Sequence, residues 1–205
     1  MQKTDIYAIT AEEFSLGRSN IEVVEELVKA GVKIIQYREK EKKKLYKYRE
    51  CKKIREITRA AGVTFIVNDD VDLALLVGAD GVHVGQEDLP VEEVRKLVGE
   101  EKIIGLSTHT PEQARHAVKI GADYIGVGPI YATNTKKDVC DPVGLEYLEY
   151  VANNINIPFV VIGGIKEHNI LQVKEKGATC FAMVTEIVGA QDIPAKINSI
   201  RQKLK

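Results

Sequence analysis

Residues 121–138 read Gly-Ala-Asp-Tyr-Ile-Gly-Val-Gly-Pro-Ile-Tyr-Ala-Thr-Asn-Thr-Lys-Lys-Asp, and they predict a helix end, a strand and a long polar loop. The apolar pair Tyr124-Ile125 indicates a buried strand, which the glycines and the proline of residues 126–129 then end. The loop that follows carries hydroxyl and ammonium groups at residues 133–137. Hydroxyls, backbone amides and a lysine charge suit an anionic oxygen cluster, and a solvated basic loop is the alternative.

The start of this stretch recurs elsewhere in the chain, as Gly-Ala-Asp at residues 78–80 and as Gly-Ala-Thr at residues 177–179. Residues 78–80 and 177–179 occupy the same place, between a helix end and a strand start. Strand and helix patterns alternate eight times, and the strands are continuous apolar runs, as expected when both faces of a parallel sheet are buried. We therefore predict a single α/β domain over residues 1–205, a (β/α)8 TIM barrel. An open doubly wound sheet is the alternative, but it needs a glycine-rich turn where Ala11-Glu12-Glu13 stands.

The strand boundaries follow from the apolar runs and their flanking glycines. Strands are expected at residues 5–10, 32–37, 63–67, 81–84, 102–106, 124–125, 157–162 and 179–184, with helices between them. The seventh helix is expected near residues 166–176, and the last from about Pro194 to the end.

Composition excludes several classes of protein. The chain has 205 residues, 44% of them hydrophobic, and a net charge of −1 from 29 basic and 30 acidic residues. Such a balance provides no basic field for nucleic acid, and no apolar run approaches the length of a membrane span. The first 14 residues lack the apolar segment of a secretory signal. Three widely spaced cysteines argue against disulfides or a zinc site, so we expect reduced thiols in a cytoplasmic protein. The sequence does not decide the oligomeric state, and a homo-oligomer is compatible with it.

In a barrel, the residues that follow the strands meet at one rim. The second strand brings Gln36, Arg38 and Lys40, which alternation places on one side. Three donors, two of them cationic, suit a diphosphate. The interleaved Glu39 and Glu41 also fit an ordinary solvated ion-pair surface, which is the alternative.

Carboxylates follow the next two strands. Asn68-Asp69-Asp70 follows the third strand, and Asp88 follows the fourth. Carboxylates from neighbouring loops beside a diphosphate are hard oxygen ligands suited to Mg²⁺, which completes its shell with waters and substrate phosphates. Helix capping, by Asp70 before Val71 and by Asp88 before the next helix, is the alternative.

The remaining strand ends carry small and hydroxyl residues. Ser107 and His109 follow the fifth strand, Gly163-Gly164 the seventh and Val184-Thr185 the eighth. Amides after strands seven and eight often bind a phosphate monoester, although a glycine pair can also form a tight turn. His109 is either a general base or a solvent-facing residue, and His83 lies within a strand, in the core or at the mouth. The rim thus predicts a metal-diphosphate site and a monophosphate site in one cavity, as in group transfer with loss of pyrophosphate.

These motifs resemble the thiamine phosphate synthase family along essentially the whole chain. The matching stretches are residues 36–40 (QYREK), 68–71 (NDDV), 78–88 (GADGVHVGQED), 105–110 (GLSTHT), 123–138 (DYIGVGPIYATNTKKD), 142–144 (PVG) and 162–165 (IGGI). The resemblance implies two small phosphorylated substrates, 4-amino-2-methyl-5-(diphosphooxymethyl)pyrimidine and 4-methyl-5-(2-phosphooxyethyl)thiazole or its 2-carboxylate. The implied products are thiamine phosphate and pyrophosphate. The diphosphate leaves first, and the thiazole nitrogen captures the resulting pyrimidine methyl cation.

The resemblance also implies roles for residues at matching positions. The pyrimidine diphosphate would contact Gln36, Tyr37, Arg38, Glu39, Lys40, Asn68, Ser107 and Lys136, of which Arg38, Lys40, Ser107 and Lys136 would be catalytic. Mg²⁺ would be held by Asp69 and Asp88. The thiazole phosphate would contact Thr133, Asn134, Thr135, Gly164, Val184 and Thr185. In one departure, Glu186 follows Thr185 where the family usually has a small residue pair around a serine, and its charge would lie near the thiazole phosphate.

Two rival functions share some of these features. The related thiazole tautomerase has the same barrel and typically a Ser-x-His motif like residues 107–109. It has no diphosphate to expel, so the pair Asp69 and Asp88 and the loop at residues 133–137 favour the synthase. A non-catalytic barrel that binds a phosphorylated ligand would not need two carboxylates and Lys136 around one leaving group.

Overall fold

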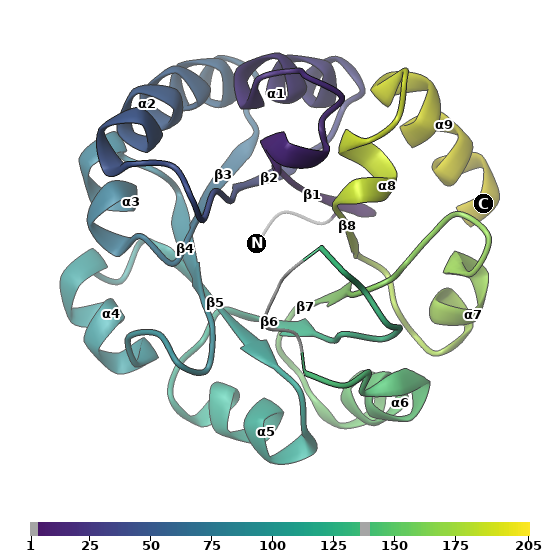
Figure 1. Ribbon diagram of the computed structural model, residues 1–205. Coiled ribbons are helices and arrows are strands. Elements are labelled where there is room, and N and C mark those ends of the chain that lie inside the picture. The colour runs from purple at the N-terminus through teal and green to yellow at the C-terminus, as the bar shows by residue number, and fades with distance from the viewer. Residues whose placement is uncertain (1–3, 136–139) are drawn as a thin grey trace.

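The computed structural model describes residues 4–135 and 140–205. Within these ranges eight parallel strands close into a barrel in sequence order, with the first strand paired to the last. Helices surround the strands in an outer ring (Figure 1). The predicted (β/α)8 barrel is thereby confirmed. None of the described helices is long and apolar enough to cross a membrane.

The strands are β1 (Ile6–Ile9), β2 (Ile34–Tyr37), β3 (Thr64–Asn68), β4 (Gly81–Val84), β5 (Ile103–Thr108), β6 (Tyr124–Val127), β7 (Phe159–Ile162) and β8 (Phe181–Met183). The helices are η1 (Glu12–Phe14, a 3-10 turn), α1 (Asn20–Lys29), α2 (Lys44–Ala60), α3 (Val71–Val77), α4 (Val91–Val98), α5 (Pro111–Lys119), α6 (Gly144–Asn154), α7 (Ile170–Glu175), α8 (Thr185–Val188) and α9 (Ile193–Leu204).

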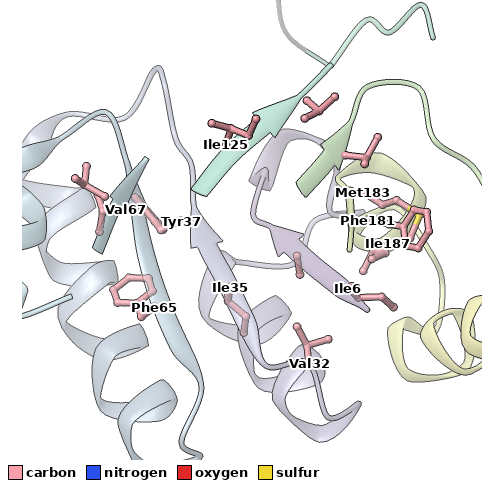
Figure 2. Packing of buried hydrophobic residues seen from close by; sticks show 14 of the residues in the cluster. Ile6, Val32, Ile35, Tyr37, Phe65, Val67, Ile125, Phe181, Met183 and Ile187 are labelled. Carbon is pink, nitrogen blue, oxygen red and sulfur yellow. The ribbon is translucent and has the colours of Figure 1, made fainter. Parts of the chain in front are cut away.

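Two apolar layers explain why the strands read as unbroken hydrophobic runs. Residues such as Ile35 and Phe65 pack between the sheet and the helices, as Figure 2 shows. Their neighbours point to the other side, because successive side chains on a strand alternate. These neighbours form a second, smaller cluster inside the barrel, which includes Tyr7, Ile34 and Tyr124.

Glycines within the strands make room for large side chains inside the barrel. β5 extends to Thr108 and β6 to Val127, so the glycine at 126 does not end its strand as expected. A Cβ at Gly105 would lie 2.2 Å from the Tyr124 ring, and one at Gly126 would lie 3.3 Å from the His83 ring. These glycines therefore permit close packing within the strands instead of breaking them.

The helices near the end of the chain differ most from the predicted ones. α7 begins at Ile170, later than predicted, because Asn169 forms a turn in which its Oδ1 accepts from the Lys166 amide at 2.8 Å. The unpredicted helix α8 follows β8 directly and lies beside η1 (Figure 1). The Arg18 guanidinium donates to the carbonyls of Val188 and Ala190 at 2.6 and 2.7 Å, and so satisfies groups at the end of α8.

Candidate active site

A cavity of about 1070 Å³ opens at the carboxyl ends of the strands, and residues from all eight strands line it. Most of the predicted site residues line this cavity together. They are Gln36, Arg38, Lys40, Asn68, Asp69, Asp88, Ser107, Thr133, Asn134, Thr135, Gly164, Val184 and Thr185. Lys136, the remaining predicted catalytic residue, lies outside the described residues.

Tyr37 and Glu39 are not among the residues that line the cavity, and their predicted contacts with the substrate stay predictions. The Tyr37 hydroxyl donates to Glu50 of α2 at 2.6 Å. Glu39 Oε1 accepts from the Glu12 amide and from Asn20 Nδ2, both at 2.9 Å. The physical reason is alternation along an extended chain, which turns Gln36, Arg38 and Lys40 inward and their neighbours outward.

The cationic side of the cavity is built by the chain that leaves β2. The Arg38 amide donates to Thr10 Oγ1 at 3.0 Å, while its guanidinium has no hydrogen bond or ion pair to any described residue. Lys40 forms an ion pair with the Asp69 carboxylate. A guanidinium that lines a cavity without a protein partner can bind a phosphate through two donors at once.

Asp69 and Asp88 form the acidic side of the same region. Asp69 has a φ of 58°, in the left-handed region that is uncommon outside glycine. Burial raises the pKa of Asp69, the Lys40 ion pair lowers it, and the nearby Asp88 raises it again, so that it ends above its usual value. Two carboxylates that repel each other beside the cations Arg38 and Lys40 have the chemistry to hold Mg²⁺.

Helix capping does not account for these carboxylates. Asp88 Oδ2 accepts from the Gly85 amide at 2.7 Å and makes no cap to α4. Asp70, at the start of α3, has no side-chain cap bond and instead pairs with Lys47 at 3.0 Å. Within residues 4–135 and 140–205, no three His, Cys, Asp or Glu side chains form a metal-binding group. Asp69 and Asp88 suit Mg²⁺, which usually takes one or two carboxylates together with substrate phosphates.

A chain of hydrogen bonds crosses the floor of the cavity. Gln36 Nε2 donates to the Tyr7 hydroxyl at 2.9 Å, and the hydroxyls of Tyr7 and Tyr124 lie 2.7 Å apart. His83 Nδ1 lies 2.9 Å from the Tyr124 hydroxyl, and His83 Nε2 lies 2.9 Å from Ser107 Oγ. Sequence reasoning missed Tyr7 and Tyr124, although each carries a hydroxyl within a wholly buried strand.

The direction of this chain follows from its donors. Because Gln36 Nε2 can only donate, the Tyr7 oxygen accepts, and the buried Tyr7 proton goes to Tyr124. Tyr124 then donates to His83 Nδ1. Burial lowers the pKa of His83 to about 4, so the ring is neutral and carries its proton on Nε2, which donates to Ser107. The serine proton is therefore free to point into the cavity.

The opposite side of the cavity is built from hydroxyls and glycines. Thr133 Oγ1 lies 3.1 Å from Thr135 Oγ1, and the Thr135 amide lies 3.4 Å from Thr133 Oγ1. Gly164 has a φ of 63°, and a Cβ there would lie 2.7 Å from the Ala132 carbonyl oxygen. The glycine therefore allows the loop after β6 to pack directly on the turn after β7.

Two charged or titratable residues at the rim have definite partners. Glu186 pairs with Lys166 at 3.4 Å and with Lys196 at 3.5 Å, so its negative charge is compensated on the protein side. His109 lines the cavity, and its Nδ1 donates to the Gly128 carbonyl at 2.6 Å. That bond fixes the ring against the loop after β6 and differs from the solvent-facing alternative.

Comparison with known proteins shows which family the chain resembles. The family model described as thiamine monophosphate synthase matches residues 6–187. A thiamine-phosphate synthase of Pelotomaculum thermopropionicum is 70% identical over 199 residues, which cover 97% of this chain and 91% of the relative. One of Lawsonia intracellularis is 56% identical over 200 residues, covering 98% and 92%.

A solved structure extends the agreement to three dimensions. Thiamine phosphate pyrophosphorylase from Pyrococcus furiosus matches with a TM-score of 0.89 at 34% identity, over 98% of this chain and 96% of that one. Family model, relatives and structure all cover the residues that build the cavity. The chain belongs to the thiamine monophosphate synthase family.

Proposed function

We propose that this enzyme, a transferase of thiamine biosynthesis, joins the pyrimidine diphosphate to the thiazole phosphate and releases pyrophosphate. The observation that carries the proposal is that one cavity has a cationic side and a side built of hydroxyls and glycines. One side offers the guanidinium of Arg38 and the ammonium of Lys40 beside two carboxylates. The other side offers hydroxyls of the loop at residues 133–135 and the turn at Gly164.

In this reaction, negative charge develops on the leaving diphosphate, which lies on the Arg38 and Lys40 side of the cavity. The bond between the pyrimidine methylene carbon and the bridging oxygen breaks, and its electron pair leaves with the diphosphate. The thiazole nitrogen then uses its lone pair to form the new C–N bond. Mg²⁺, held by Asp69 and Asp88, would neutralise charge on the leaving group when bound.

The protein residues stabilise and orient the reacting groups. Arg38 and Lys40 hold the diphosphate, and the free Ser107 proton is available to a developing oxyanion. Lys136 would add a point charge at the same leaving group, a role supported by the family motif. No nucleophile of the protein is needed, because the two substrates react with each other once both are bound in position.

The direct test is a product assay with the purified protein, both substrates and Mg²⁺. We expect pyrophosphate and thiamine phosphate to appear in equal amounts, and neither to accumulate when one substrate is omitted. Isomerisation of the thiazole without pyrophosphate release would identify a tautomerase instead. Binding of a substrate without any turnover would favour the non-catalytic barrel.

A further inference from the structure

We propose that Glu39 is a positioning residue, which holds Arg38 and Lys40 toward the cavity by tying the chain after β2 to the chain after β1. The inference rests on the proposed function, because it concerns the diphosphate side of the same site. Residues 38–43 belong to no helix or strand, so their course depends on contacts made by their side chains and amides.

The Glu39 carboxylate is the centre of the first part of this anchor. Its Oε1 accepts from the Glu12 amide at 2.9 Å and from Asn20 Nδ2 at 2.9 Å. Asn20, at the start of α1, has no exposed surface. Its Nδ2 also lies 3.2 Å from Glu50 Oε2 on α2, so one buried amide connects the chain after β2 with α1 and α2.

Lys42 forms the second part of the anchor, four residues beyond Arg38. Its ammonium donates to Glu12 Oε2 at 2.6 Å and to the Glu50 carboxylate. Glu12 Oε2 in turn accepts a hydrogen bond from the backbone N–H of Asn20 at 3.1 Å. Burial by itself lowers the pKa of Lys42, but the hydrogen bonds of Glu12 and Glu50 raise it above its usual value, so Lys42 remains charged.

Solvent screening does not reduce this network to an ordinary surface ion pair. The side chains of Lys42 and Glu50 are only 24% and 17% exposed, and Asn20 is wholly buried. Charge-assisted hydrogen bonds in such partly buried settings are stronger than those on an open surface. The anchor can therefore order a short irregular segment.

The cations on the other side of the same segment lack comparable restraint. The Arg38 guanidinium has no partner among the described residues, and the side chain of Lys40, which pairs with Asp69, is 46% exposed. Because alternation turns Glu39 outward, fixing its carboxylate also fixes the direction in which its two neighbours point. Both cations are thereby oriented before the diphosphate arrives, and misplacement by about 1 Å at a reacting site can cost about 10²-fold in rate.

The test compares Glu39→Ala with Glu39→Gln, whose amide oxygen can still accept both hydrogen bonds. Glu149→Ala is the matched control, since it removes a carboxylate that pairs with Lys176 at 3.0 Å outside the cavity lining. For Glu39→Ala we expect kcat/KM for the pyrimidine diphosphate to fall about 10- to 100-fold, with the KM for the thiazole phosphate changed less than about twofold. Glu39→Gln should recover most of the loss, and Glu149→Ala should match the wild type.

A binding measurement separates this inference from the proposed function. Calorimetric titration of inorganic pyrophosphate with Mg²⁺ should show weaker binding to Glu39→Ala than to the wild type, whether or not the wild type forms thiamine phosphate. If the alanine variant does not fold, Glu39→Asp replaces it, because it keeps the charge but shortens the reach. Unchanged kcat/KM and pyrophosphate affinity would overturn the proposal, as would equal losses for both substrates that track a lower melting temperature.

Discussion

His83 Nε2 lies 2.9 Å from the hydroxyl of Ser107 and holds that side chain at the end of a buried hydrogen-bond chain. Because His83 Nε2 donates to the serine oxygen, the Ser107 proton remains available to a group in the cavity. A double-mutant cycle can measure how far the two residues act as a unit.

We expect His83→Ala to lower kcat about fivefold, because a fixed hydrogen bond to a neutral partner contributes about 1 kcal/mol. Ser107→Ala should lower kcat further, since it removes the donor itself. The double variant should be no slower than Ser107→Ala. Fully additive losses in steady-state kcat would show that the two residues act independently.

The burial of His83 also predicts how stability depends on pH. The folded-state pKa of about 4 lies below the ordinary value of 6.5, so the unfolded chain binds the proton more readily between these values. This residue's contribution is therefore complete above about pH 6.5 and is lost as pH falls toward 4. Urea unfolding of the wild type in EDTA should lose about 2 kcal/mol more than His83→Gln between pH 7 and pH 5. Parallel pH profiles for the two proteins would contradict the assignment.

The carboxylate pair predicts an absolute requirement for a divalent cation. Asp69→Asn and Asp88→Asn should each lower kcat on the order of 10²-fold or more, because the leaving group loses its charge compensation. Asparagine is the appropriate replacement at 69, since it tolerates the left-handed backbone found there. Turnover is measured over a range of Mg²⁺ after treatment with chelator. Normal rates without the cation would remove Asp69 and Asp88 from the metal site.

We expect substitution of Lys136 to act mainly on kcat and substitution of Thr133 to act mainly on KM. A lysine beside the bridging oxygen stabilises charge that develops only as the bond breaks, so Lys136→Ala should lower kcat on the order of 10²–10³-fold. Thr133→Ala should chiefly raise the KM for the thiazole phosphate, whose charge does not change. If Lys136→Ala raised only the KM for the pyrimidine, this lysine would be a binding contact alone.

Gly164 predicts a steric requirement at the monophosphate side. An alanine there would combine a φ of 63° with a Cβ 2.7 Å from the Ala132 carbonyl, which displaces the loop after β6. We expect the KM for the thiazole phosphate to rise at least about tenfold. Gly121→Ala is the control, because its φ of 81° imposes similar strain while no atom lies within 4 Å of the new Cβ. Equal effects of the two variants on KM would show that strain and not loop packing is responsible.

The sequence predicted the barrel because apolar runs alternate with helical patterns and most of them are bounded by a glycine, and these are local signals. The comparisons confirm the family and the enzyme class as well. The local runs could not give strand ends such as Thr108, because β5 continues to that residue by pairing with Val127 of β6, a partner distant in sequence. α8 was missed for a similar reason, since Arg18, far away in sequence, supports its end.

The site was predicted only in part to the level of individual side chains. Alternation placed Gln36, Arg38 and Lys40 on one side, and all three line the cavity. Motif matching treated residues 36–40 as one binding segment and so added Tyr37 and Glu39, which do not line it. The pairing of Tyr7 with Tyr124 joins residues 117 positions apart, and no local pattern encodes such a contact. The roles of Asp69, Asp88 and Lys136 stay predictions.

In the proposed reaction, one cavity brings a metal-bound diphosphate and a second phosphorylated substrate together. A single-turnover experiment tests it most directly, with enzyme in excess over the pyrimidine diphosphate and with Mg²⁺ or EDTA present. We expect one pyrophosphate and one thiamine phosphate per pyrimidine consumed, only with Mg²⁺ and only when the thiazole phosphate is also supplied. Pyrophosphate without thiamine phosphate, or equal turnover in EDTA, would contradict it.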